Sequence, residues 1–199
     1  MGCSAGRIVL ASLCAILLTI ALRLAPSQAE EGPPDVFIDA GACPFECCTY
    51  REWFADRDIT LWDRPNSTQI VAHLRKDDPV DGLTGEVHSI PLRVTAGTDL
   101  PLTAIGPAVA GNAEAPDMIK AGDVFYVLHY AGEGVWKVWH RGKVAELEVA
   151  DETGTAAKPS PVSWPRRLKS TWWVQVRTRQ GVVGWTVSKG NFRNQDQCG

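Results

Sequence analysis

Four cysteines are the residues of this chain whose type and spacing are best suited to chemistry. Three lie close together and one lies near the opposite end: Cys43, Cys47, Cys48 and Cys198. An even number of cysteines in an exported chain indicates disulfides. A bridge between the adjacent Cys47 and Cys48 would strain their peptide unit, so we expect Cys198 to pair with one member of the N-terminal trio. The other two would then close a local loop.

The alternative for the cluster of Cys43, Cys47 and Cys48 is thiol or metal chemistry. Thiolates bind soft metals, but the spacing in residues 43–48 is not that of a zinc ribbon or knuckle, and no histidine lies nearby in the sequence. The sequence therefore predicts no metal and no cofactor. A thiol- or metal-handling envelope protein is kept as the alternative function.

The remaining residue types that support catalysis are not arranged in a recognisable pattern. The chain has four histidines, none in a metal-ligand spacing or beside a nucleophile motif: His73, His88, His129 and His140. We interpret His129 as a half-buried strand residue rather than a general base. Glu133 is a single turn carboxylate, whereas glycosidase chemistry requires two. The sequence predicts that the protein is not an enzyme and has no catalytic residues.

Tryptophans are the candidate recognition residues, since the chain has eight. Side chains alternate between the two faces of a strand, so Trp172, Val174 and Val176 share one face, which we expect to be the core. Trp173 and Arg177 then point the other way.

The same alternation in the run from Val135 to Arg141 places Trp136 and Val138 inside and Lys137 and Trp139 outside. An exposed tryptophan beside a basic residue is typical of a recognition surface. The alternative is that the long loops cover both outward tryptophans. The predicted ligand-binding residues are Trp139, Trp173, Arg177 and Lys137.

The N-terminus has the features of a signal peptide. An apolar run of 15 residues, Ile8–Leu22, is shorter than the ~20 residues that span a membrane, and Arg23 ends it. Small residues at Ser27 and Ala29 predict cleavage after Ala29, and the short distance from Arg23 leaves an uncleaved anchor as the alternative. We expect a secreted or periplasmic protein with no stable membrane span after cleavage.

The charge of the mature chain argues against nucleic-acid binding. Removal of residues 1–29, which include Arg7 and Arg23, leaves 170 residues and changes the net charge from −3 to −5. From Lys158 onward, however, eight basic residues stand against one acid, Asp196. This region is either a face for an anionic surface or a solvated basic edge.

Short alternating apolar runs bounded by Gly, Pro, Asp and Asn predict an all-β fold. Glycine-containing turns at residues 130–135 and 178–181 predict two hairpins. Residues 30–55 should form an extended Cys-rich leader, and Gly97–Pro116 and Ala150–Pro165 long Gly- and Pro-rich surface loops. The predicted strands are Asp58–Trp62, Gln69–Leu74, Gly85–Val94, Val124–Tyr130, Val135–Arg141, Thr171–Thr178 and Val182–Val187.

Two segments resemble the bacterial SH3-like domain family. The run Ile59–Asp77 resembles its first strands and turn proline, and Trp172–Val187, with Gly181 and Gly184-Trp185, resembles its closing hairpin. The resemblance implies a small β-barrel that binds a peptide, a cell-wall fragment or an envelope protein and does not catalyse a reaction.

The two matching segments are separated by about 95 residues where the family has few. Either one barrel, residues 56–199, carries a large insertion, or Val124–Val144 belongs to a second barrel. In the second case the two barrels are interleaved or tandem, at about residues 56–96 and 117–192. A weak internal repeat of Trp-x-Val strands, beginning at Trp136 and at Trp172, is consistent with two barrels.

Overall fold

The computed structural model describes residues 32–103, 117–148 and 168–198, and every regular element within these ranges is a strand. None of the described residues forms a helix that is long and apolar enough to cross a membrane. The all-β class predicted from the alternating runs is confirmed. The predicted signal peptide and its cleavage site lie outside the described residues.

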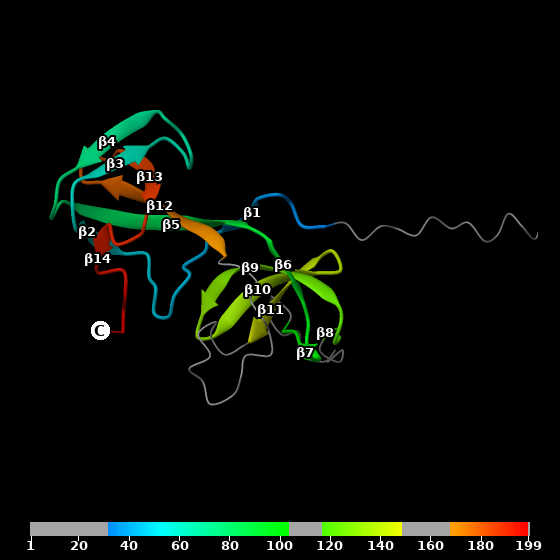
Figure 1. The fold of residues 1–199 in the computed structure, drawn as a ribbon. Helices are drawn as coiled ribbons and strands as arrows, with labels where there is room; N and C mark the ends of the chain where they lie inside the picture. Colours follow the sequence, from blue (N-terminus) through cyan, green and yellow to red (C-terminus); the bar gives the residue numbers. More distant parts are fainter. Residues whose placement is uncertain (1–31, 104–116, 149–167, 199) are drawn as a thin grey trace, which may run out of the picture. The chain divides into compact units, whose positions relative to one another are not determined.

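Eight strands form one sheet, here called the large sheet. Their order is β14-β2-β5-β12-β13-β3-β4, and β1 pairs with β5 beside this path. The sheet curls into a half-barrel (Figure 1). The strands are β1 (Phe37–Ala40), β2 (Glu52–Ala55), β3 (Ile59–Trp62), β4 (Ile70–Leu74), β5 (Pro79–Ile90), β12 (Lys169–Thr178), β13 (Val183–Val187) and β14 (Phe192–Arg193).

Four strands form a second sheet, here called the inserted sheet because the chain makes it between β5 and β12. Its order is β11-β10-β9-β6, and a two-stranded ladder of β7 with β8 accompanies it. The strands are β6 (Leu92–Thr95), β7 (Leu100–Pro101), β8 (Met118–Ile119), β9 (Val124–Gly132), β10 (Val135–His140) and β11 (Lys143–Glu148). The second group of β strands is therefore nested within the first along the sequence.

Each sheet has its own hydrophobic core. In the large sheet, Val174 and Val176 of β12 are buried against residues from both ends of the chain, such as Trp53 and Phe192. In the inserted sheet, Phe125, Trp136 and Val138 belong to a separate cluster. Of the predicted core face of β12, Val174 and Val176 are buried and Trp172 is half-buried. The predicted inward face of β10 is confirmed, because Trp136 and Val138 are buried.

All seven predicted strands are present, and the two predicted hairpins join β9 to β10 and β12 to β13. The strand expected at Gly85–Val94 is divided at Pro91 into the end of β5 and β6. Two strands, β1 and β2, lie in the expected leader and pair with β5. Their four-residue length is too short for an alternating pattern to mark them.

The prediction that Gly97–Pro116 is a surface loop is wrong for the first residues of that range. Leu100 and Leu102 are buried in the core of the inserted sheet, because the chain there pairs with residues 117–119 and with Glu146. Residues 104–116 and 149–167, which contain most of the two predicted loops, lie outside the described residues.

Candidate functional site

Trp172 forms an aromatic shelf at the edge of the large-sheet core. Its ring is half-buried and lies 6.4 Å from the ring of Trp53, which is fully buried. Phe45 meets it edge to face at 5.6 Å. The indole Nε1 donates a hydrogen bond to the carbonyl oxygen of Ala42 at 3.2 Å. These contacts fix the ring by both its apolar surface and its polar atom.

Gly85 and Tyr50 complete the support of this shelf. A Cβ at Gly85 would overlap with both Trp172 Nε1 and the Tyr50 hydroxyl, so only glycine lets both groups reach the carbonyl of Ala42. Burial raises the pKa of Tyr50 to about 12, against the opposing effect of its hydrogen bond with Trp172. Tyr50 therefore keeps its proton near neutral pH and remains a donor to Ala42.

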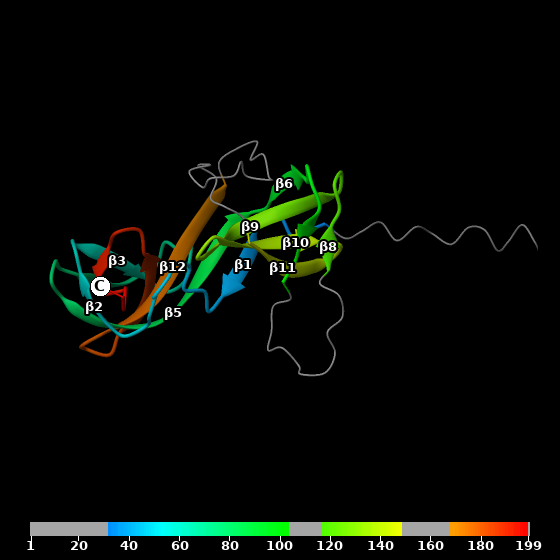
Figure 2. The same ribbon diagram turned by 90° about the horizontal axis from the view of Figure 1, so that it is seen from below.

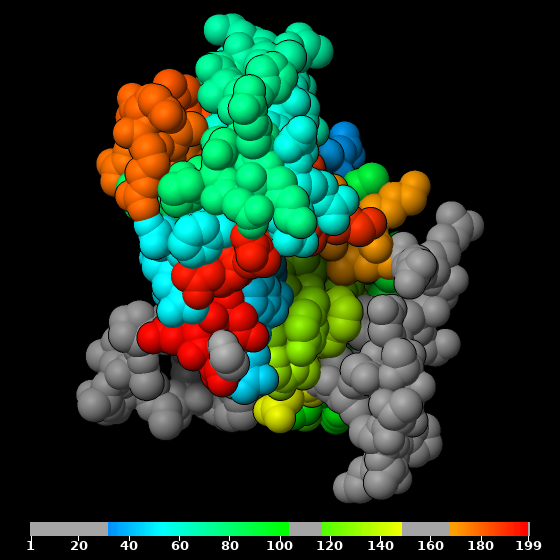
Figure 3. Space-filling model, turned by 90° about the vertical axis from the view of Figure 1, so that its left-hand side faces the viewer, coloured from blue at the N-terminus to red at the C-terminus, as the bar shows by residue number. Residues whose placement is uncertain are grey.

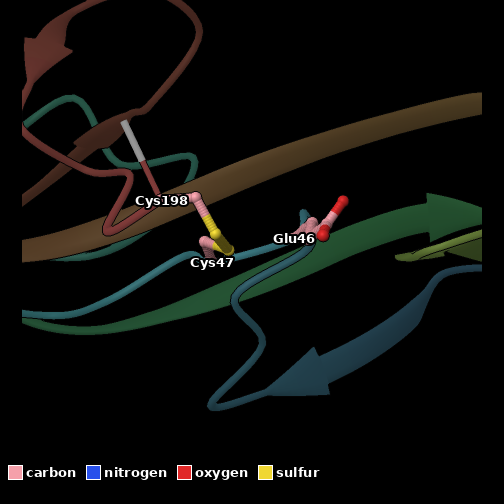
Figure 4. Close-up of side chains that lie close together, drawn as sticks. All are labelled: Glu46, Cys47 and Cys198. Carbon is pink, nitrogen blue, oxygen red and sulfur yellow. A yellow bond between two sulfur atoms is a disulfide. The ribbon is translucent and has the colours of Figure 1, made fainter.

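The disulfides join Cys43 to Cys48 and Cys47 to Cys198, with the two Cα atoms of each pair 5.6 Å apart. This confirms that Cys198 pairs with one of the trio (Figure 4) and that the other two close a local loop. The bridges bring the C-terminal segment against the N-terminal one, as Figure 3 shows in red and cyan. Phe45 lies inside the local loop, and Gln195 lies three residues before Cys198.

A cleft of about 440 Å³ opens beside the shelf, and we call it the Trp172 cleft. Its walls come from the Cys-rich loop, the start of β12 and the segment that follows β13. Ser188, on one wall, is hydrogen-bonded to the amide of Gln195 at 3.0 Å. The cleft thus combines an aromatic surface with hydroxyl, amide and ammonium groups. Its lining includes Phe45, Ser170, Trp172, Ser188, Lys189 and Gln195.

Lys189 is the charged group of this cleft. It is exposed, and it makes no ion pair with any residue in the described ranges. The arginines of the same C-terminal region are different. Arg177 pairs with Asp81 at 3.3 Å, and Arg179 and Arg193 pair with acids of the N-terminal half. The predicted basic region is therefore neutralised at these arginines, while Lys189 is available for an anionic group; Lys158, Arg166 and Arg167 lie outside the described residues.

The four residues predicted to bind a ligand are divided between the two sheets. Trp139 and Lys137 share a face of β10, and both are half-buried. Trp173 and Arg177 lie on β12. The expectation that Trp173 is exposed is wrong, since only 9% of it is accessible. Trp62 of β3 and His88 of β5 pack beside its ring, because the curled sheet aligns aromatic residues of several strands on this face.

Lys137 takes part in a partly buried ionic cluster that could not be predicted from the sequence. Its Nζ lies 2.6 Å from Asp39 Oδ2, and His129 Nε2 lies 2.9 Å from the same oxygen. His129 is only 2% accessible, rather than half-buried as predicted. Its Nδ1 lies 2.7 Å from the carbonyl oxygen of Tyr130. The cluster ties β1 of the large sheet to the inserted sheet.

The pKa of Asp39 is set by two opposing effects. Burial alone would raise it, but the hydrogen bonds from His129 and Lys137 outweigh burial and hold the pKa below its ordinary value of 3.8. A carboxyl whose pKa is lowered by folding stabilises the fold above its unfolded pKa, and this contribution is lost as the pH falls through the folded pKa.

Replacing Asp39 by Asn should test the cluster. We expect Asp39→Asn to lower the free energy of unfolding by about 2 kcal/mol at pH 7, since the hydrogen bonds with Lys137 and His129 lose their anionic acceptor. The difference from the wild type should shrink below pH 3.8, the ordinary pKa of Asp39, as the wild-type carboxyl gains a proton. Urea denaturation at pH 7 and pH 3 measures both effects, with Asp35→Asn on an exposed carboxyl as the control. A loss that does not change with pH would contradict this role for Asp39.

Glu46 lies beside the Cys47–Cys198 bridge (Figure 4). A carboxylate oxygen of Glu46 and the two sulfur atoms of the bridge lie within 4.8 Å of one another. Both sulfur atoms are bonded in the disulfide, so neither is a thiolate that binds a metal in this state. Metal or thiol chemistry at the predicted cluster would first require reduction of the bridges.

The Trp172 cleft is the arrangement of described residues best suited to holding a ligand, since aromatic, hydrogen-bonding and cationic groups converge there. The sequence predicts Trp172 in the core and Phe45 in the leader. Phe45 was not predicted to bind a ligand; the signal that could have pointed to the cleft is its position between two cysteines, which places an aromatic ring on a disulfide-closed loop. Comparisons with models of known protein families, with curated proteins and with solved structures give no match to this chain.

Proposed function

We propose that the chain is a non-catalytic exported binding or scaffolding module and that the Trp172 cleft is its recognition site. The ligand is a peptide, a cell-wall fragment or a partner protein. In this proposal residues 1–29 are removed on export, and the large sheet serves as an elaborated SH3-like barrel. The observation that carries the proposal is the convergence on one open cleft of Trp172, Phe45 and Lys189, which has no ion-pair partner among the described residues.

The chemistry of the cleft fits recognition rather than bond breaking. An aromatic face binds the apolar side of a ligand, hydroxyl and amide groups select its polar atoms, and an ammonium group attracts an anion. The disulfides hold opposite walls in place, so little ordering cost remains when a ligand enters. Two disulfides also suit an oxidising compartment outside the cytosol.

The mature protein should bind envelope material through this cleft. We expect binding of soluble fragments from an envelope preparation of the producing cells, which muramidase releases from the wall and trypsin from proteins. Binding is measured as quenching of the protein's total tryptophan fluorescence, to which Trp172 contributes. Lys189→Glu should weaken binding about tenfold, the effect of losing one charge-assisted contact. The matched control is Lys143→Glu, which reverses an exposed lysine on β11 of the inserted sheet.

Each outcome of this experiment bears on the proposal. Near-wild-type binding by Lys143→Glu and weak binding by Lys189→Glu support it. Equal weakening by both variants indicates non-specific charge attraction and contradicts the assignment of the cleft. Absence of binding to either class of fragment contradicts the proposed function itself.

A further inference from the structure

We infer that the ligand is an extended acidic peptide that adds to β12 as a further strand, at the edge formed by Lys169–Thr171. This inference rests on the proposed function and names the partner class for the same cleft. Three features support it: the pairing of β12, the two clefts beside its first residues, and the two lysines of these clefts, which form no ion pair with the described residues.

The first residues of β12 are paired on one side only. On that side β12 pairs with β5 along its whole length, from Lys169 opposite Ile90 onward. On the other side β13 begins to pair only at Trp173. Figure 2 shows β12 running beside β5. The Ser188 amide donates to the Trp172 carbonyl at 2.9 Å, and the chain then turns away at Gly190, whose φ is 62°. No strand in the described ranges pairs with Lys169–Thr171 on this side.

The backbone N–H and C=O of Ser170 are the hydrogen-bonding groups that this edge presents to an added strand. Backbone groups of successive strand residues point to alternate sides, so Ser170 faces the same side as the Trp172 carbonyl. Ser170 is exposed. Thr171, between them, faces β5. An unpaired strand edge of this kind is a template for strand addition, in which main-chain hydrogen bonds hold an extended peptide.

Two clefts meet at this edge. Trp172 lines the first and Lys169 lines the second, and these side chains project from opposite faces of β12 because they are three residues apart on the strand. The Trp172 cleft includes Ser170 and Thr171, and a second cleft of about 420 Å³ includes the same two residues. We call it the Ile90 cleft; its apolar wall is made by Val36, Ile90 and Leu168. Side chains of an extended peptide alternate between faces. A strand paired with Ser170 therefore places successive side chains in the two clefts by turns.

The positive charge of the two clefts favours a peptide with acidic side chains. Lys169 lines the Ile90 cleft and Lys189 lines the Trp172 cleft. Both are exposed, and neither forms an ion pair with the described part of the chain. Acidic side chains beside an aliphatic one match these surroundings, and complementary charge favours both the encounter and the register.

The probe for this inference is a six-residue peptide of alternating valine and glutamate with blocked termini. Two further forms carry N-methyl groups on every valine nitrogen or on every glutamate nitrogen. In an added strand only one set of amides faces β12. We expect one methylated form to bind at least about tenfold more weakly, because several hydrogen bonds are lost, and the other to bind like the parent. Fluorescence anisotropy of the labelled peptides on the full mature protein measures this difference.

Hydrogen exchange gives an independent readout on the protein. The Ser170 amide should exchange quickly in the free protein and slowly in the complex with the probe. The Thr171 amide, which faces β5, should be protected in both states. Lys189→Glu should weaken binding of the probe, and Lys143→Glu should not.

Several results would overturn the inference. If both methylated forms bind equally while Lys189→Glu still weakens binding, the cleft binds peptide without strand addition, and only the proposed function survives. If the probe does not bind but envelope fragments do, the partner is not an acidic strand. If the protein forms a dimer that protects Ser170 and excludes the probe, the edge belongs to a second copy of this chain.

Discussion

Replacing both Cys47 and Cys198 by Ser should lower the free energy of unfolding by about 5 kcal/mol, the largest stability loss that we expect from this chain. The bridge spans 151 residues, so its loss releases a long loop in the unfolded state. Urea denaturation of the mature protein at pH 7 measures the change.

The second disulfide provides the control. The bridge between Cys43 and Cys48 spans only five residues, so replacing both by Ser should cost about 2 kcal/mol on the same chain-entropy argument. Equal losses for the two double variants would contradict an effect of loop length. They would indicate that the bridges act mainly through the contacts of the Cys-rich loop.

Trp53→Ala should lower the free energy of unfolding by about 4 kcal/mol, because it empties the centre of the large-sheet core. Trp53 is fully buried, and its ring lies 5.5 Å from both Tyr50 and Phe192. A Cβ on Gly82 would come within 2.8 Å of the ring, which shows how closely the backbone of β5 approaches it. Thermal or urea unfolding provides the measurement.

Trp139→Ala is the matched control, since it removes the same side chain from a half-buried position on β10. We expect a clearly smaller loss there, because less apolar surface leaves water when that side chain packs. The Trp53 variant should also bind the ligand more weakly, since the ring of Trp53 packs edge to face against the ring of Trp172. A loss at Trp53 no larger than that at Trp139 would mean that the large-sheet core does not depend on this residue.

The N-terminal segment shows why part of the fold could not be predicted from the sequence. Residues 30–55 have paired prolines and few alternating residues, so an extended leader was the natural prediction. Yet β2 contributes Trp53 and Ala55 to the core. A four-residue strand is specified by its partner, here β5, rather than by its own pattern.

The candidate site shows a similar division. Alternation in β12 correctly placed Val174 and Val176 inside, but it could not show that Trp173 is covered by Trp62, which is more than 100 residues away in sequence. It also could not show that the core ends at Trp172 and opens into a cleft. Asp39 and His129 are 90 residues apart, and nothing local to either residue indicates that they meet.

The amino-acid sequence by itself determined the all-β class, the seven main strands, the two hairpins and the pairing of Cys198 with one of the three N-terminal cysteines, but not with which one. These follow from side-chain alternation, turn residues and the geometry of adjacent cysteines, all of which act over a few residues. Only the tertiary structure decided the nesting of the sheets, the burial of Trp173, the cluster at Asp39 and the open edge at Ser170. Those features depend on pairings such as Ser170 with Ser89, in which residues distant in the chain must first be brought together.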